Sequence, residues 1–88
     1  MVAASIDLEH VRRSRRLLTI LVDRFGVAHF LDRSSVNMRA CDDAIALACA
    51  WIERRTDRPV SEDVEAIMRR ELQRVLKTRI ASGAALSR

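Results

Sequence analysis

Apolar side chains recur every three or four positions along three long segments of the chain, and this spacing is typical of helices. The segments run over residues 6–25, 36–54 and 62–81. No segment shows the alternation of apolar and polar residues that marks a half-buried strand. The pattern therefore predicts an all-α protein built from three principal helices.

Capping and chain-breaking residues stand between these segments. Ser5 or Asp7 can accept hydrogen bonds from the free amides that begin the first helix, and Gly26 can adopt the left-handed conformation that ends it. Pro59 prevents the second helix from continuing into the third, which Ser61 caps. These residues support the predicted helix boundaries.

The segment between the first two helices is less regular. Residues 27–31 are predicted to form a short helical turn, and residues 32–35 a break in which either serine can cap the helix that follows. Residues 27–45 also fit a helix-turn-helix unit weakly, with the helix after the break reading DNA bases. The match is poor in the turn itself, where Asp32 stands in place of the expected glycine.

The second segment is apolar on nearly every side. Its clearly polar residues are few, namely Asn37, Arg39, Asp42, Asp43 and Glu53. A helix that is apolar all round is normally buried among other helices. We therefore predict a small helical bundle with the second helix in the centre and Trp51 filling its wider end.

The chain of 88 residues accommodates a single domain. We expect this domain to cover residues 6–81, between a disordered N-terminus (1–5) and a flexible C-terminal tail (82–88). A domain of this size buries only about 60 to 65% of its unfolded surface, so self-association would stabilise it. The apolar faces of the first and third helices are therefore predicted to form a homodimer or partner interface, through Leu18, Leu21, Leu72 and Val75.

Arginine dominates the positive charge of the chain. The formal net charge is +4, and Lys77 is the only lysine among 16 basic residues. Guanidinium suits two-pronged contacts with carboxylate or phosphate. The residues predicted to contact an anion or nucleic acid are Arg12, Arg13, Arg15, Arg16, Arg70 and Arg74. Two alternatives stay open: acidic residues of other helices neutralise these arginines, or codon usage rather than contact chemistry explains their number.

One group of residues resembles a catalytic triad in composition. Asp7, His10 and Ser14 share a helix face at spacings of three and four. A single solvent-facing helix offers neither a pocket nor an oxyanion donor, so we interpret the group as a capping aspartate beside an exposed histidine and serine. Cys41 and Cys49 lie too far apart along one helix for a disulfide. Because the sequence also lacks metal-ligand spacing and a phosphate-binding glycine loop, no enzyme, cofactor or metal is expected.

The sequence thus favours a non-enzymatic regulatory or adaptor protein that acts through protein–protein interaction and homodimerisation. The alternative is an arginine-rich DNA-binding protein or transcriptional regulator, whose affinity would fall as salt rises because phosphate contacts release counterions. The sequence shows neither a signal peptide nor a run long enough to span a bilayer, so we expect a cytoplasmic protein with no membrane partner.

Overall fold

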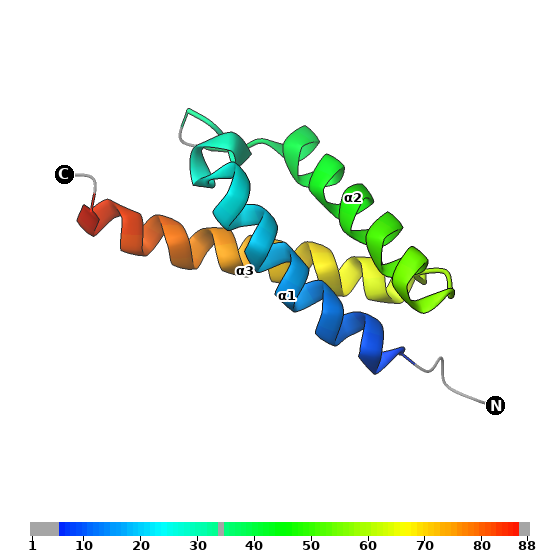
Figure 1. Cartoon of the computed structure of the whole chain (residues 1–88). Helices are drawn as coiled ribbons and strands as arrows, with labels where there is room; N and C mark the ends of the chain where they lie inside the picture. Colours follow the sequence, from blue (N-terminus) through cyan, green and yellow to red (C-terminus); the bar gives the residue numbers. More distant parts are fainter. Residues whose placement is uncertain (1–5, 34, 87–88) are drawn as a thin grey trace.

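Three long helices pack into a small bundle in the computed structural model of the chain, which describes residues 6–33 and 35–86 (Figure 1). The elements follow one another as α1 (Leu8–Phe25), the 3-10 helix η1 (Val27–Phe30), strand β1 (Leu31–Asp32), strand β2 (Ser35–Val36), α2 (Met38–Thr56) and α3 (Glu62–Leu86). The predicted all-α bundle of three principal helices is confirmed. None of the described helices is long and apolar enough to cross a bilayer. The expected disorder of residues 1–5 concerns a segment outside the described residues.

The helices begin at the predicted capping residues, with one exception. Oδ1 of Asp7 accepts hydrogen bonds from two amides in the first turn of α1, at 3.1 and 3.3 Å. Ser61 Oγ accepts from an amide in the first turn of α3, at 3.2 Å. The cap of α2 is Asn37, whose side chain accepts from the Ala40 amide at 3.2 Å. The predicted serine cap was wrong because Ser35 is held in strand β2, too early in the chain to reach that amide.

The connection between α1 and α2 is a short turn followed by a hairpin. Gly26 ends α1 with a φ of 84°, in the left-handed region that glycine adopts without strain. The predicted helical turn is present as η1, and β1 and β2 then pair antiparallel, with Leu31 opposite Val36. Two residues per strand are too few to show a period, so the sequence pattern did not predict them. A helix-turn-helix unit needs two helices joined by a brief turn, and this arrangement does not provide one.

The core lies where the three helices meet. α1 packs against both α2 and α3, and η1 adds an aromatic ring. The largest fully buried apolar side chains are Phe30, Leu18, Ile45, Ile52, Met68, Leu72 and Leu76. The residues predicted to face a second copy, Leu18, Leu21, Leu72 and Val75, all belong to this core, and none exposes more than 9% of its surface. This assignment is corrected: α1 and α3 bury these side chains within one chain, which leaves them unavailable to a second copy.

α2 buries one of its sides and exposes the other. Its buried residues follow the helical repeat and are Ala40, Cys41, Ala44, Ile45, Ala48 and Ile52. Leu47 and Trp51 are 50% and 41% exposed, although both are large and apolar. The apolar character of α2 on nearly every side, which predicted a central and fully covered helix, therefore includes a face that the rest of the chain does not cover.

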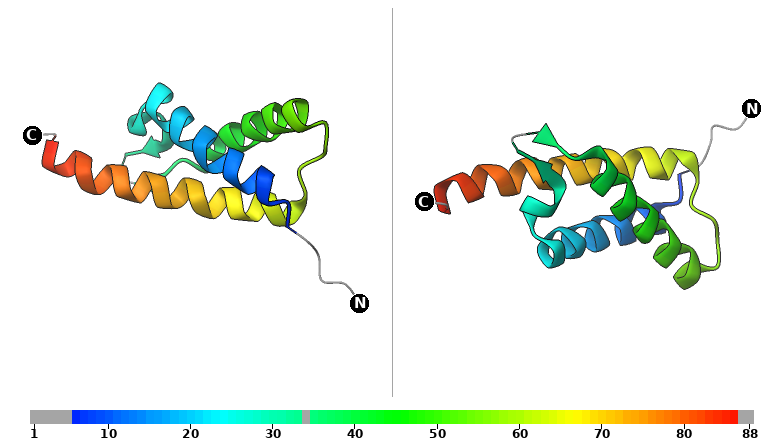
Figure 2. Two further views of the ribbon diagram at one scale, coloured as in Figure 1. Left: turned by 60° about the horizontal axis from the view of Figure 1, so that its bottom comes forward. Right: turned by 90° about the horizontal axis from the view of Figure 1, so that it is seen from above.

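α3 is longer than the sequence pattern predicts. It continues to Leu86, so residues 82–86 are helical instead of forming the expected flexible tail, and residues 87–88 lie outside the described residues. Alanine and leucine favour helix strongly enough to accommodate the single glycine at position 83. Figure 2 shows this end of α3 extending beyond α1 and α2.

Candidate functional site

An open groove of about 740 Å³ lies between α1 and α2. Its lining residues are Glu9, Arg12, Arg13, Arg15, Arg16, Leu17, Ile20, Trp51 and Arg55. The two helices run in roughly opposite directions and cross obliquely (Figures 1 and 2), and the side chains of His10 and Thr56 meet between them at one end. The groove therefore gathers the four α1 arginines that were predicted to contact an anion and adds Arg55 from α2.

Apolar side chains form part of the surface of this groove. Leu17 is half-buried, whereas Ile20 and Trp51 are 47% and 41% exposed. Leu47 stands one helical turn before Trp51 on the same face of α2, next to the groove but outside its lining, and is 50% exposed. We call these four residues the apolar floor. The sequence interpretation placed Trp51 inside the bundle, and the structure places it at the surface.

The arginines of the groove differ in whether the protein itself neutralises them. Arg13 pairs with Glu9 at 3.0 Å, and Arg15 approaches Glu71 of α3 at 3.9 Å. In the described part of the chain, no carboxylate forms an ion pair with the remaining three, which are Arg12, Arg16 and Arg55. The Arg55 guanidinium instead lies 4.7 Å from the centre of the Trp51 ring, a cation–π contact.

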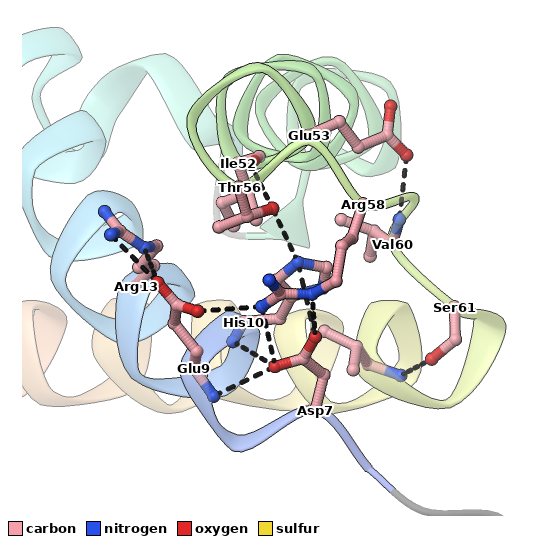
Figure 3. Close-up of polar contacts among 11 residues, drawn as sticks. Asp7, Glu9, His10, Arg13, Ile52, Glu53, Thr56, Arg58, Val60 and Ser61 are labelled. Carbon is pink, nitrogen blue, oxygen red and sulfur yellow. Dashed lines mark hydrogen bonds and ion pairs between the residues drawn. The ribbon is translucent and has the colours of Figure 1, made fainter.

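Glu9, the one carboxylate among the described residues that line the groove, is already engaged. Arg58, from the loop before α3, donates to Glu9 at 2.7 Å and to Asp7 at 2.9 Å (Figure 3). The Arg58 hydrogen bonds lower the pKa of both carboxyl groups, and Arg13 adds to the effect on Glu9. Both groups are therefore ionised at neutral pH and held by these cations, so the charge of Arg12 nearby stays uncompensated.

A buried polar contact fixes α1 to α2 at this end of the groove. His10 is 1% exposed, and its Nε2 lies 2.9 Å from Thr56 Oγ1 (Figure 3). The Thr56 hydroxyl donates its single proton to the Ile52 carbonyl at 2.8 Å, so it accepts from His10, and Nε2 carries the hydrogen. Among the described residues, His10 Nδ1 has no hydrogen-bond partner. The histidine is therefore an interhelical hydrogen-bond donor.

The triad-like group Asp7, His10 and Ser14 is built into the fold. The predicted capping role of Asp7 is confirmed. The expected exposure of the other two is wrong, because His10 faces α2 and Ser14 is fully buried, where its hydroxyl donates to the Val11 carbonyl at 2.8 Å. That hydrogen bond directs the Ser14 hydroxyl to the backbone of α1.

The arginines of α3 surround a second, smaller hollow, of about 370 Å³. It is lined by Arg69, Arg70, Gln73, Arg74 and Lys77. Arg69 pairs with Asp42 of α2 and with Glu65, and Arg74 donates to Glu71 at 2.6 Å. Glu71 is 9% exposed, and the hydrogen bond from Arg74 lowers its pKa. Arg70 and Arg74, predicted to act with the α1 arginines, therefore lie in a separate hollow, where carboxylates of the chain neutralise part of the charge.

The two cysteines have the character of packed apolar residues. Cys41 is buried, and burial raises the pKa of the Cys49 thiol to about 11. The Cys49 thiol is therefore protonated at neutral pH and lies 3.8 Å from the Met68 sulfur. Within residues 6–33 and 35–86, no three His, Cys, Asp or Glu side chains come together as a metal site.

Comparison of the chain with protein-family models, with curated proteins and with solved structures found no match. The geometry and charge of the groove are therefore the observations that bear on function. Sequence reasoning identified its α1 arginines but missed the α2 side, which consists of Trp51 and Arg55. The spacing of four between these residues was the available signal, because it puts them on one face of a helix.

Proposed function

We propose that this chain is a non-enzymatic adaptor or regulatory protein that binds another protein through the α1–α2 groove. The observation that carries the proposal is the combination of an exposed apolar floor with arginines that have no carboxylate partner among the described residues. Tryptophan and arginine are the residue types most enriched among those that dominate the energy of protein interfaces. A partner that covered the floor would remove Ile20, Leu47 and Trp51 from water.

The floor is not an unfinished part of the core. The helices already bury one continuous set of apolar side chains, and Leu47 and Trp51 lie at the edge of the buried stripe of α2 with 50% and 41% of their surface exposed. Exposed apolar groups that gather in one groove with a polar rim are typical of interaction sites. The groove is therefore better explained by an external partner than by the stability of the bundle.

A second copy of the chain is a poorer occupant than a different protein. A twofold interface places the same patch of both copies in contact, so the arginines of two grooves would face one another. Arg12, Arg16 and Arg55 of both copies would then lie in one interface, with Glu9 already held by Arg13 and Arg58. Homodimerisation through this groove is thus opposed by charge, and a partner with negative charge is favoured.

DNA binding by the same arginines is the competing proposal. Duplex DNA offers phosphates to guanidinium groups but no apolar surface of matching extent for the floor. Labelled duplex DNA at about 50 and about 200 mM salt tests it, since several phosphate contacts would produce a steep loss of anisotropy signal over that range. We expect weak binding that does not depend on Ile20 or Trp51.

Site-specific photo-crosslinking tests the proposal. A benzophenone amino acid replaces Ile20 in the groove, or Ala66 on the exposed side of α3 as a matched control, in the full chain expressed in its native cells. The expected result is a crosslink from position 20 to a different protein, absent at position 66 and reduced by Arg12→Gln with Arg16→Gln. Equal crosslinking at both positions, or none to any protein, would overturn the proposed function.

A further inference from the structure

We infer that the occupant of the α1–α2 groove is an amphipathic helix of the partner whose acidic residues cluster toward one end. This inference rests on the proposed function and makes it specific. It follows from three properties of the groove: its length between two antiparallel helices, the placement of its apolar residues, and the placement of its uncompensated charge.

The shape of the groove suits a helix. The lining residues of α1 run from Glu9 to Ile20, a span of about 16 Å at 1.5 Å per residue, or three helical turns. α1 and α2 present neighbouring antiparallel surfaces, and a further helix laid between them would complete a four-helix arrangement. A helix that contacts such a groove does so with residues spaced i, i+3 or i+4, and i+7.

The arginines of the groove lie toward the end marked by His10 and Thr56, whereas its apolar residues begin beside them, at Leu17 and Trp51, and continue to Ile20. His10 contacts Thr56, so Arg55 of α2 lies level with the start of α1, near Arg12. Leu47 stands nine residues before Thr56 on α2, and Ile20 stands ten residues after His10 on α1. Because the helices are antiparallel, these two exposed apolar side chains lie at the opposite end from Arg55.

The basic end calls for carboxylates. Arg12, Arg16 and Arg55 have no ion pair among the described residues, and the adjacent Glu9 is shared by Arg13 and Arg58. Bidentate contacts between guanidinium and carboxylate are the strongest ones these arginines can form with a protein. An occupant with an apolar stripe along its length and Asp or Glu gathered toward one end therefore matches the groove.

Trp51 provides a direct reporter, because it is the only tryptophan in the chain and it lines the groove. The test uses a displayed library of 18-residue peptides, long enough to be helical. Each member has Leu or Ile at i, i+3, i+4 and i+7, and Glu, Gln or Lys at every flanking position. Selection on the full chain is expected to enrich Glu over Gln and Lys at flanking positions near one end. Enriched peptides should change Trp51 fluorescence.

Matched variants separate local charge from total charge. Arg12→Gln with Arg16→Gln is expected to weaken the best Glu-containing peptide by about tenfold or more, while Arg24→Gln with Arg39→Gln, which removes the same charge outside the groove, changes it less than about twofold. Enrichment of Gln or Lys, Glu spread evenly along the peptide, or equal loss in both double variants would overturn the inference. A crosslink from position 20 to a protein would still uphold the proposed function in that event, so the two failures are distinguishable.

Discussion

Two arginines of the α1–α2 groove and two of α3 carry the same functional group, but only the α3 pair meets carboxylates of the chain among the described residues. On α3, Arg69 and Arg74 are paired with carboxylates of the chain, Asp42, Glu65 and Glu71. In the groove, Arg12 and Arg16 border an exposed apolar floor and have no such partner among the described residues. The difference shows that a cluster of arginines in a sequence does not reveal which of them the fold neutralises with its own carboxylates.

The largest expected effect distinguishes the core beneath α1 from the floor of the groove. Leu18→Ala should lower the free energy of unfolding by about 2–5 kcal/mol, because Leu18 is fully buried and its truncation leaves a cavity. Ile20→Ala, two residues away and 47% exposed, should change it by less than about 0.5 kcal/mol. Urea unfolding followed by circular dichroism measures both. A large loss for Ile20→Ala would mean that the floor is part of the core.

The second-largest expected effect concerns the hydrogen bond between His10 and Thr56, which joins α1 to α2 at the basic end of the groove. Thr56→Val keeps the shape of the side chain but removes the acceptor of the buried His10 Nε2–H, and this should cost about 1–3 kcal/mol of stability. Thermal unfolding is the measurement, with Thr78→Val, at an exposed site on α3, as the control. Equal stability of both variants would contradict the interhelical role of His10.

Glu71 tests the claim that α3 neutralises its own arginines. Glu71→Gln should cost about 1 kcal/mol at pH 7, because the hydrogen bonds from Arg74 then lack the carboxylate charge. The pKa of Glu71 is lowered in the folded chain, so its contribution is complete above the ordinary carboxyl pKa and is lost as pH falls through the lower folded value. Urea unfolding from pH 7 to pH 2 should show the wild type and the variant converging. A difference in the free energy of unfolding that stays constant from pH 7 to pH 2 would contradict the stabilising role of the Glu71 carboxylate.

The smallest effect is also the sharpest contrast between the two sets of arginines. Arg12→Gln with Arg16→Gln should leave stability unchanged or raise it by a few tenths of a kcal/mol, because it removes a like-charge pair four residues apart. Arg69→Gln should instead lower stability by up to about 1 kcal/mol, since it removes ion pairs with Asp42 and Glu65. Urea unfolding of both variants at low salt shows whether each one raises or lowers the free energy of unfolding. Equal destabilisation by the two changes would remove the contrast.

The helices could be predicted from the sequence because their signals are local. Pro59, Ser61 and Gly26 act on the backbone next to them, and the boundaries that they predict lie within two or three residues of those observed. The late end of α3 was missed because the small residues that follow Ala81 fit a helix as well as a tail.

The site could be predicted only in part, because its features depend on tertiary packing. The arginines of α1 were visible in the sequence, but their partners were not, since Glu71 is distant in the chain and reaches Arg15 only through the packing of α3 on α1. Likewise, α2 is apolar on nearly every side, so its pattern could not show which side faces the bundle. Trp51 is exposed because tertiary packing, which the pattern does not reveal, decides which side of α2 faces the bundle.

We propose that the α1–α2 groove, and not the α3 hollow, receives a protein partner. The crosslink from position 20, compared with position 66, is the decisive measurement. We expect a product with a different protein at position 20 that depends on Arg12 and Arg16 and is absent at position 66. The same product from both positions, or no protein product at position 20, would show that the groove does not receive a protein partner.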